Sequence, residues 1–473
     1  MRLSKALGVN RGDIISLVGA GGKTTAMYRL ACELAAEGWR VVTTTTTMIR
    51  LEERGEQTIL EPQETRLLES VEAALERHSH ITVATGLRED EGKLMGVEPS
   101  LVDEMVALPM VDVVIVEADG AKGRSLKGPA VYEPVIPSGT SILVPIAALD
   151  ALGQRLDDKI AHRPEIVARL ANVELGQVIT PEMVFGILTH PEGGIKNAPD
   201  QARIIPLINK VTAAEMKPAR EIAQLLLTSS RVQRVLLGAV AEEDPIKEAW
   251  GRVAAIVLAA GESRRFGSPK QLLPWGETTL LEHVVDAVLE SSVEDTLVIL
   301  GYRAEEMGAL LQDRPIRLVI NEHWSKGLSS SVEAGLKALP ATCEACLFLL
   351  GDQPNATTEL VDSILERYRR TLAAIVAPSY RGRRGNPVLF TSSLFPELLT
   401  LEGDQGGREV ILRRQDEVET VEVDEESIFL DIDTTADYQE ARQRDDSYHP
   451  SPSRPDGMEP GREVPGAHRY RVE

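Results

Sequence analysis

The stretch that most constrains this chain is a glycine-bearing loop between an apolar run and an amphipathic run. The apolar run, 253–258, has the length of a buried strand, and apolar residues at helical spacing over 280–289 predict a helix. Within the loop, Gly261 and Gly267 let backbone amides approach a ligand that a Cβ would hold away. The same loop carries the cations Arg264, Arg265 and Lys270. Amide dipoles together with fixed positive charge suit a triphosphate, so we expect a nucleotide-binding α/β unit, with a basic surface loop as the alternative.

A carboxylate follows a second strand-like run in the same half of the chain. The apolar run 345–350 ends in Gly351-Asp352-Gln353-Pro354. Open α/β sheets bind ligands at the carboxyl ends of their strands, and Mg²⁺ prefers hard oxygen ligands. We therefore expect Asp352 to hold Mg²⁺ beside the phosphates that the loop binds. A simple turn or cap role is the alternative interpretation.

These motifs together resemble the MobA-like nucleotidyltransferases. Every fixed position of the signature Leu-Ala-Ala-Gly-x-Ser-x-Arg-x-Gly-x-x-Lys is filled from Leu258 to Lys270, and 271–276 continues it as in the molybdenum cofactor branch. The resemblance implies a Rossmann-like domain over 252–443. Its nucleotide-binding residues would be Leu258, Ala259, Ala260, Gly261, Ser263, Arg264, Lys270, Ser329 and Ser330. Ser330 also has capping-box spacing to Glu333, which is the structural alternative for that serine.

The reaction implied by this resemblance transfers CMP from CTP to molybdopterin and releases pyrophosphate. Its catalytic residues would be Arg264, Lys270 and Asp352, and its metal ligands Asp352 and Asp433. Arg264 and Lys270 would neutralise the leaving pyrophosphate, while Mg²⁺ bridges phosphate oxygens. The segment 377–390 resembles the family's Gly-x-x-Gly-His-Pro-Val, which falls on 382–388 with Asn386 in place of His, and its three arginines are candidates to face an anionic pterin phosphate.

The first half of the chain opens with a second strand–loop–helix pattern. A strand over 13–18 runs into Gly19-Ala20-Gly21-Gly22-Lys23-Thr24-Thr25, and a helical pattern covers 26–37. This order is typical of phosphate-binding α/β units, so we expect Gly21, Gly22, Lys23 and Thr24 to bind a nucleotide in a P-loop-like domain. Position 17 is Leu where the standard P-loop has Gly, so the loop is shorter or differently bent. A tight glycine-rich turn is the alternative.

Two further features of this half lie at expected strand ends. Glu117 and Asp119 follow the apolar run 111–116, where a magnesium-organising carboxylate would lie. The threonines 43–47 either bind phosphate or metal, or simply continue a strand. Together with 117–129, 190–196 and 206–210, these pieces resemble the YqeC family, which is linked to selenium-dependent molybdenum hydroxylases. The resemblance implies an accessory domain and a molybdenum hydroxylase apoenzyme as a possible partner, and it leaves open whether NTP is hydrolysed or only bound.

Composition limits partners and compartment. The formal net charge of −22 argues against nucleic-acid binding, and no apolar run is long enough to span a membrane. Three cysteines cannot form a disulfide framework, so we expect a reducing cytoplasm and a structural role for Cys343 and Cys346.

The length of 473 residues requires more than one domain. We expect an α/β fold in two domains: 1–238, a linker over 239–251, 252–443, and a disordered Pro-rich tail over 444–473. Two alternatives to cytidylyl transfer stay open. One is a nucleotidyltransferase for another phosphorylated substrate, and the other is a non-catalytic carrier or insertion protein for molybdopterin. The nucleobase and the oligomeric state are not determined by the sequence.

Overall fold

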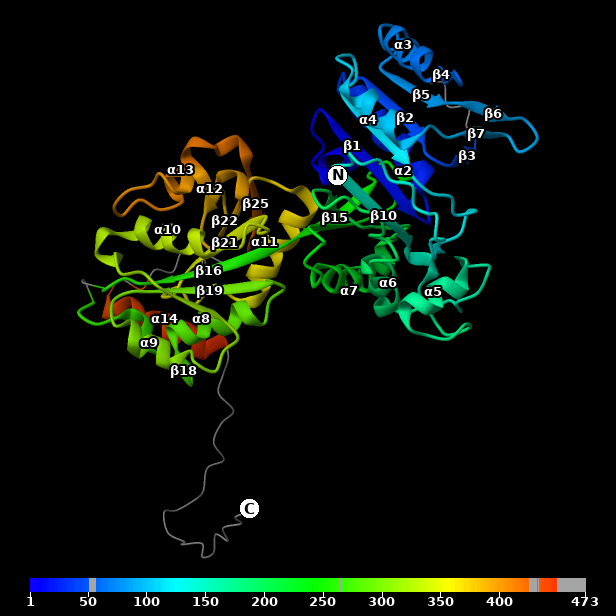
Figure 1. The fold of residues 1–473 in the computed structure, drawn as a ribbon. Helices are drawn as coiled ribbons and strands as arrows, with labels where there is room; N and C mark the ends of the chain where they lie inside the picture. The colour runs from blue at the N-terminus through cyan, green and yellow to red at the C-terminus, as the bar shows by residue number, and fades with distance from the viewer. Residues whose placement is uncertain (51–56, 264–265, 425–431, 433, 449–473) are drawn as a thin grey trace, which may run out of the picture.

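The computed structural model describes residues 1–50, 57–263, 266–424, 432 and 434–448, and it forms a mixed α/β protein with two large sheets (Figure 1). The first is a 10-stranded sheet in the order β15-β14-β13-β10-β1-β8-β2-β5-β4, with β12 beside β10. Its strands are β1 (Asp13–Gly19), β2 (Val41–Thr45), β4 (Gln57–Leu60), β5 (His80–Ala84), β8 (Val113–Glu117), β10 (Ile142–Ala148), β12 (Arg203–Ile204), β13 (Leu207–Asn209), β14 (Arg234–Gly238) and β15 (Ile246–Gly251). All these pairings are parallel except that of β15 with β14.

Helices cover both faces of this sheet because its central strands are apolar on both sides. Ile15 and Leu17 pack with α1 (Leu3–Leu7) and α2 (Lys23–Ala36), whereas Ile14 and Val18 belong to the core on the other face. That second face is covered by α3 (Glu64–Leu75), α4 (Pro99–Ala107), α5 (Pro164–Ala171), α6 (Pro181–Thr189) and α7 (Met216–Leu227). Continuous burial on two faces is expected of a parallel sheet.

The second sheet has 8 strands in the order β20-β19-β16-β21-β24-β22-β23, with β25 beside β22. They are β16 (Val253–Ala259), β19 (Asp295–Leu300), β20 (Arg317–Ile320), β21 (Ala345–Leu350), β22 (Ile375–Tyr380), β23 (Arg383–Arg384), β24 (Val388–Thr391) and β25 (Val418–Glu422). β16 is central and parallel to both β19 and β21. The helices are α8 (Leu280–Leu289), α9 (Ala304–Leu310), α10 (Leu328–Ala338), α11 (Thr358–Thr371), α12 (Phe395–Leu398), α13 (Arg408–Arg413) and α14 (Thr435–Tyr448). The helix expected over 280–289 is confirmed as α8, and Thr279 caps it with Glu282.

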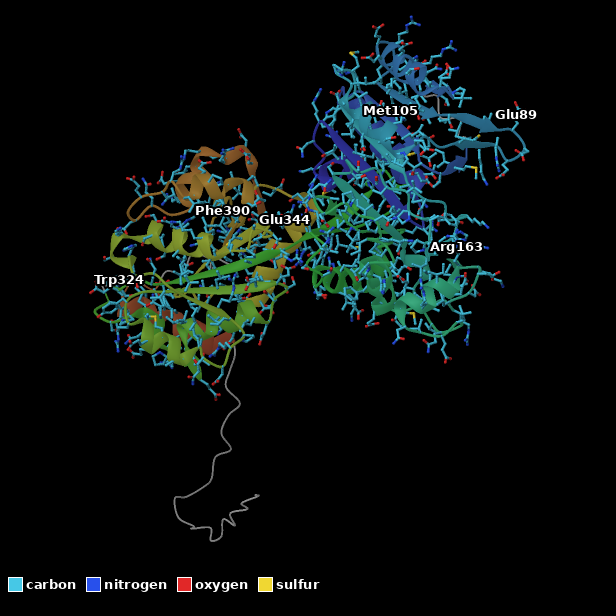
Figure 2. All side chains as sticks on the ribbon, viewed as in Figure 1. Glu89, Met105, Arg163, Trp324, Glu344 and Phe390 are labelled. Carbon is cyan, nitrogen blue, oxygen red and sulfur yellow. The ribbon has the colours of Figure 1, made fainter. Side chains whose placement is uncertain are left out.

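The segment expected to link the two halves is partly a strand. Residues 246–251 form β15, an edge strand of the first sheet. The buried Glu248 on β15 accepts hydrogen bonds from Arg220, and Arg220 also reaches Glu366 on α11 at 2.7 Å. The Arg369 guanidinium lies 3.6 Å from the centre of the Trp250 ring. The two units therefore share a packed junction, where Figure 2 shows Glu344 and where Arg234 donates to that carboxylate at 3.0 Å.

This junction sets the direction in which each unit's ligand edge faces. Arg234 is the first residue of β14, and it pairs with Gly251, the last residue of the antiparallel strand β15. The chain therefore leaves the first sheet at the edge where its parallel strands begin. It then enters β16 at the amino edge of the second sheet, one residue later. The carboxyl edges of both sheets, which carry the glycine-rich loops, thus lie on the sides away from the junction.

The chain's expected tail begins inside a helix. α14 continues to Tyr448, so residues 444–448 are helical, and the rest of the expected tail lies outside the described residues. Among the helices of the described ranges, none has the length and apolar character to cross a membrane.

Candidate functional site

The loop after β16 folds back on itself at the carboxyl edge of the second sheet. Leu258, Ala259 and Ala260 are buried at the strand end, whereas Gly261 is exposed and a Cβ there would meet open space. The hydroxyl of Ser263, a residue in the left-handed region at φ 54°, accepts a hydrogen bond from the Lys270 amide at 3.2 Å. This contact returns the chain to the sheet, so that Lys270 is placed beside the strand ends. The predicted Arg264, and Arg265 with it, lie outside the described residues.

Lys270 and Asp352 come together as the parallel strands require. β16 and β21 are neighbours, so residues that follow them share one edge. Lys270 Nζ lies 3.9 Å from Asp352 Oδ2, and their side chains are 8% and 23% exposed. The ammonium group is nearly buried, while the carboxylate keeps partial access to solvent. Asp433, the other predicted metal ligand, lies outside the described residues.

Ser329 and Ser330, the predicted nucleotide-binding serines, lie in the first turn of α10. The alternative role of Ser330 as the first residue of a capping box is wrong. The helix begins at Leu328 with Gly327 as its N-cap, which puts Ser330 inside the first turn. Its hydroxyl contacts the carbonyls of Gly327 and His323 at 2.8 and 3.0 Å and accepts from Asn321. The Ser329 amide donates to the Gly403 carbonyl at 3.0 Å. Both serines therefore lie at this edge but make contacts within the protein.

A cavity of about 980 Å³ opens beside these residues. Leu258 and Leu350, the ends of β16 and β21, form one part of its wall. Apolar rings line another part: Phe348 and Phe390, the latter labelled in Figure 2, meet edge to face with ring centres 6.0 Å apart. Three arginines also line it: Arg383, Arg384 and Arg408. The sequence motifs suggested the first two arginines, but the aromatic wall has no signal in the sequence because Phe348 and Phe390 are simply apolar residues of strands.

The glycine-rich loop of the first unit connects β1 to α2. Gly21 and Gly22 have φ angles of 90° and 127°, values that other residues rarely adopt. A Cβ on Gly21 would lie 2.5 Å from the Ala148 Cβ, and one on Gly22 would lie 2.3 Å from Asn209 Nδ2. The loop therefore packs tightly against β10 and β13. α2 begins at Lys23, so its first amides face out of the helix without intrahelical partners.

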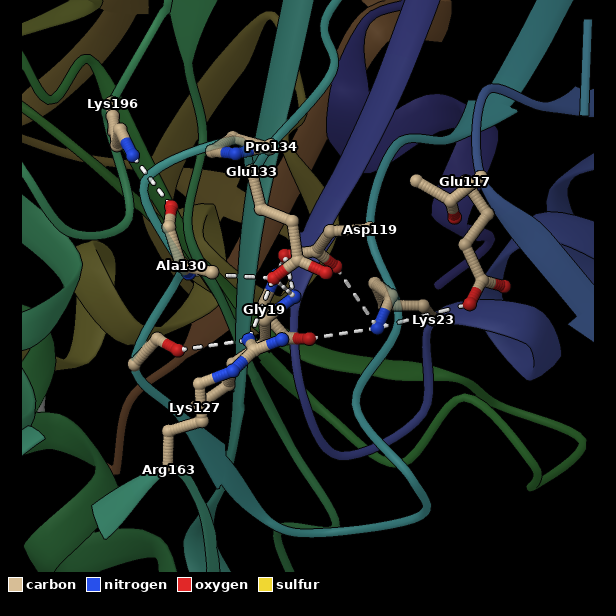
Figure 3. A network of polar contacts seen from close by, with 12 residues as sticks. Gly19, Lys23, Glu117, Asp119, Lys127, Ala130, Glu133, Pro134, Arg163 and Lys196 are labelled. Carbon is tan, nitrogen blue, oxygen red and sulfur yellow. Dashed lines mark hydrogen bonds and ion pairs between the residues drawn. The ribbon is translucent and has the colours of Figure 1, made fainter. Parts of the chain in front are cut away.

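Lys23 points back into a buried ionic network (Figure 3). Its Nζ donates to the Gly19 carbonyl at 2.7 Å and lies 3.2 Å from Asp119 and 3.7 Å from Glu117. Burial lowers the pKa of Lys23, but the charges of Asp119 and Glu117 outweigh it, and the net shift is upward. Burial raises the pKa of Glu117 despite the nearby Lys23. The Thr24 hydroxyl donates to Glu117 at 2.7 Å, so the predicted loop residues and both predicted carboxylates meet at one place.

The ionic network continues through Lys127, Glu133 and Arg163, which the sequence did not indicate would lie together. Lys127 has no exposed side-chain surface and lies 2.8 Å from carboxylate oxygens of both Asp119 and Glu133. Arg163 donates to Glu133 at 2.7 Å. Carboxylates and cations thus alternate from Glu117 to Arg163 (Figure 3). Glu133 and Arg163 stand in no recognisable motif, so only the fold brings them here.

The hydrogen bonds of the threonines at 44–46 favour a structural role over binding of phosphate or metal. Thr44 donates to the Val83 carbonyl, Thr45 to that of Glu117 and Thr46 to that of Val135, at 2.8, 2.7 and 2.6 Å. Thr44 and Thr45 thus hold β2 against β5 and β8, and Thr46 holds the segment that follows β2 against the loop at Val135. Their donors are used within the protein rather than offered to a ligand.

Comparison with known proteins divides the chain in the same way. The family model described as MobA-like NTP transferase domain matches residues 255–418. The family model described as YqeC protein matches residues 15–165.

Curated relatives match one half or the other. The Escherichia coli protein YqeC is 28% identical over 50% of this chain and 91% of its own length. The nicotine blue oxidoreductase of Paenarthrobacter nicotinovorans is 32% identical over 38% of this chain and 92% of its own. The molybdenum cofactor cytidylyltransferase of Escherichia coli is 29% identical over 41% of this chain and 96% of its own.

Proposed function

This chain belongs to the YqeC family through its first half and to the MobA-like NTP transferases through its second, and we propose that the second half transfers CMP from CTP to molybdopterin. The observation that carries the proposal is the meeting of Lys270 and Asp352 at the carboxyl edge of β16 and β21. A cation for phosphate and a carboxylate for a metal stand beside a cavity of about 980 Å³, which is large enough for a ligand of nucleotide size.

The residues fit a phosphate-bound Mg²⁺ ion. Within the described ranges no cluster of three or more His, Cys, Asp or Glu side chains forms a ready-made metal cage. Mg²⁺ is commonly held by one or two carboxylates plus substrate phosphates and water, and Asp352 supplies such a carboxylate with partial solvent access. Bound there, the ion would act as a Lewis acid on the α-phosphate.

The protein's own groups would do the rest of the work. A phosphate oxygen of the acceptor attacks the α-phosphorus of CTP in line, and the bond to pyrophosphate breaks. Lys270 would stabilise the charge that grows on the leaving pyrophosphate. The amides of the loop at Gly261 would hold the phosphates in line. No protein nucleophile is required, because the acceptor phosphate is the nucleophile.

The acceptor proposal follows from the cavity's chemistry. Arg383, Arg384 and Arg408 would bind an anion, and the rings of Phe348 and Phe390 would contact a flat heterocycle. Molybdopterin has both features, because it joins a phosphate to a flat pterin heterocycle. Another phosphorylated substrate is the alternative, and the relative named as an oxidoreductase makes reduction a third activity to assay.

Incubation of the protein with Mg²⁺, molybdopterin and each NTP in turn, with pyrophosphate release as the readout, tests the proposal. We expect release with CTP and a loss of at least 100-fold in Lys270→Met. Lys337→Met, an exposed lysine on α10, is the matched control and should retain full activity. Release with another NTP, or only with a different phosphorylated acceptor, would reassign the substrate. No release with any pair would refute the transferase proposal.

A second candidate function concerns the first half. We propose that it binds a nucleoside triphosphate through Gly21, Gly22, Lys23 and Thr24, because the first amides of α2 have no intrahelical partners and the Lys23 ammonium donates to the Gly19 carbonyl of the same loop. Calorimetric titration of the Lys270→Met chain with ATP, GTP and CTP in the presence of Mg²⁺ isolates this site. A binding heat that is lost on adding Lys23→Ala supports it. If millimolar triphosphate gives no heat, molybdopterin is the next ligand, and a carrier that serves a molybdenum hydroxylase apoenzyme becomes the better account.

A further inference from the structure

Gln353 is next to the proposed metal carboxylate in the chain and belongs to the wall of the proposed acceptor cavity. It follows Asp352 directly in the turn after β21, and its side chain lines the cavity of about 980 Å³. The backbone of this turn is fixed: the Gln353 amide donates to the Leu350 carbonyl at 3.2 Å, and the Pro354 carbonyl contacts the His283 ring at 3.2 Å. The orientation of the Gln353 side chain is set by a different contact.

That contact comes from Asn386, in the segment that leads into β24. β24 runs antiparallel to β21 with Val388 opposite Phe348. Asn386 lies two residues before the start of β24, and Gln353 lies three residues after the end of β21, so this pairing brings the two segments close together. There Asn386 Nδ2 donates to Gln353 Oε1 at 3.2 Å. The bond ties the turn to the hairpin of β22 and β23, whose arginines line the same cavity.

The direction of this hydrogen bond decides what the cavity meets. A glutamine amide has an oxygen that accepts and a nitrogen that donates. The bond from Asn386 occupies the oxygen, and among the described residues Gln353 Nε2 donates to no other group. The Gln353 Nε2 group is a hydrogen-bond donor at the wall of the arginine-lined cavity, so it suits an anionic oxygen of a ligand. If the amide turned over, its carbonyl oxygen would meet the anion and repel it.

We propose that Gln353 binds the phosphate of the acceptor through Nε2, and that Asn386 is a positioning residue that keeps the Gln353 amide in the donating orientation. The proposal deepens the proposed transferase function and rests on it. The ligand class is a phosphate monoester whose oxygen attacks the α-phosphorus. A donor held in advance lowers the entropic cost of placing that oxygen, so its loss should weaken acceptor binding far more than CTP binding.

Steady-state kinetics of variants test the pair, with KM for acceptor and KM for CTP measured separately. A hydrogen bond to a charged group is worth a change of about 10- to 100-fold, so Asn386→Ala and Gln353→Leu should each raise the acceptor KM by that factor. The CTP KM should stay within about twofold. Asn386→His, whose ring N–H restores the donor, should recover most of the wild-type KM. Gln415→Leu, an exposed glutamine on the turn before β25, is the control and should change neither constant.

The double variant distinguishes positioning from separate contributions. If Asn386 acts through Gln353, Asn386→Ala with Gln353→Leu raises the acceptor KM no more than Gln353→Leu alone. Multiplying effects, an unchanged acceptor KM in Asn386→Ala, or equal rises in both KM values would overturn the inference. Pyrophosphate release by the wild type is measured first: its absence with every acceptor refutes the transferase proposal and this inference with it, whereas normal release with unaltered acceptor KM refutes this inference alone.

Discussion

Replacement of Lys127 by methionine should weaken the first unit more than any surface change of equal size. The Lys127 side chain has no exposed surface, and its ammonium lies 2.8 Å from both Asp119 and Glu133, whose side chains are 2% and 9% exposed. Methionine keeps most of the volume and removes the charge. The variant thus leaves two buried carboxylates with one counter-charge fewer.

The expected loss of stability depends on the ion pairs that Asp119 and Glu133 keep in the variant. Removing one partner of a buried ion pair typically destabilises a protein by 3–5 kcal/mol. Here Asp119 keeps Lys23 at 3.2 Å, and Glu133 keeps Arg163 at 2.7 Å. We therefore expect the lower end, about 3 kcal/mol. For a unit of this length, that corresponds to a fall in Tm of about 6–12 °C.

Urea and thermal unfolding of the full chain, followed by circular dichroism, measure this change. Lys159→Met, an exposed lysine of the same unit, is the control and should shift stability by less than about 0.5 kcal/mol. Lys127→Met combined with Glu133→Gln removes a charge of each sign and should be less destabilised than the single variant. A loss below about 1 kcal/mol for Lys127→Met would mean that the network contributes little to folding.

Three further predictions concern the other unit, the junction and pH. Asp352→Asn should lower turnover by about 10³-fold or more while the unfolding curve is kept, and near wild-type turnover at saturating Mg²⁺ would remove Asp352 from the site. A fragment that ends at Gly251 should unfold at a higher temperature than one that ends at Pro245, because only the former keeps β15; equal Tm values would contradict this. Burial raises the pKa of Glu294 to about 7 even with Arg369 nearby, so the folded state retains a proton that the unfolded state releases, and stability should fall as pH rises from about 4.5 to about 7. In Glu294→Gln the fall in unfolding free energy between about pH 4.5 and about pH 7 should disappear. An unchanged fall would mean that other groups cause it.

Local patterns predicted the elements that hold the loops, because strand, glycine-rich loop and helix are adjacent in sequence. The same reasoning failed where a contact joins distant segments. The polar and acidic stretch that begins at 242–245 predicts a linker over 239–251, yet 246–251 form β15, in which the charged Glu248 is buried with Arg220 as its partner. The Ser330 spacing met the capping rule by chance, because the helix begins earlier, at Leu328.

The motifs of the candidate site were predictable from the sequence, but its assembly was predictable only in part. Lys270 and Asp352 belong to motifs next to strands, so their shared edge followed from parallel order alone. The hydrogen bond from Asn386 to Gln353 joins the segments beside β24 and β21, whose antiparallel pairing neither segment encodes by itself.

Isotope transfer tests the central claim most directly. The full chain is incubated with Mg²⁺, molybdopterin and CTP labelled either at the α-phosphorus or at the γ-phosphorus. We predict that the α label appears in cytidylylated molybdopterin and the γ label in pyrophosphate, in equal amounts, because the bond between the α- and β-phosphates is the one that breaks. Recovery of the γ label as inorganic phosphate, or of the α label only as free CMP, would show hydrolysis instead of transfer and would contradict the account.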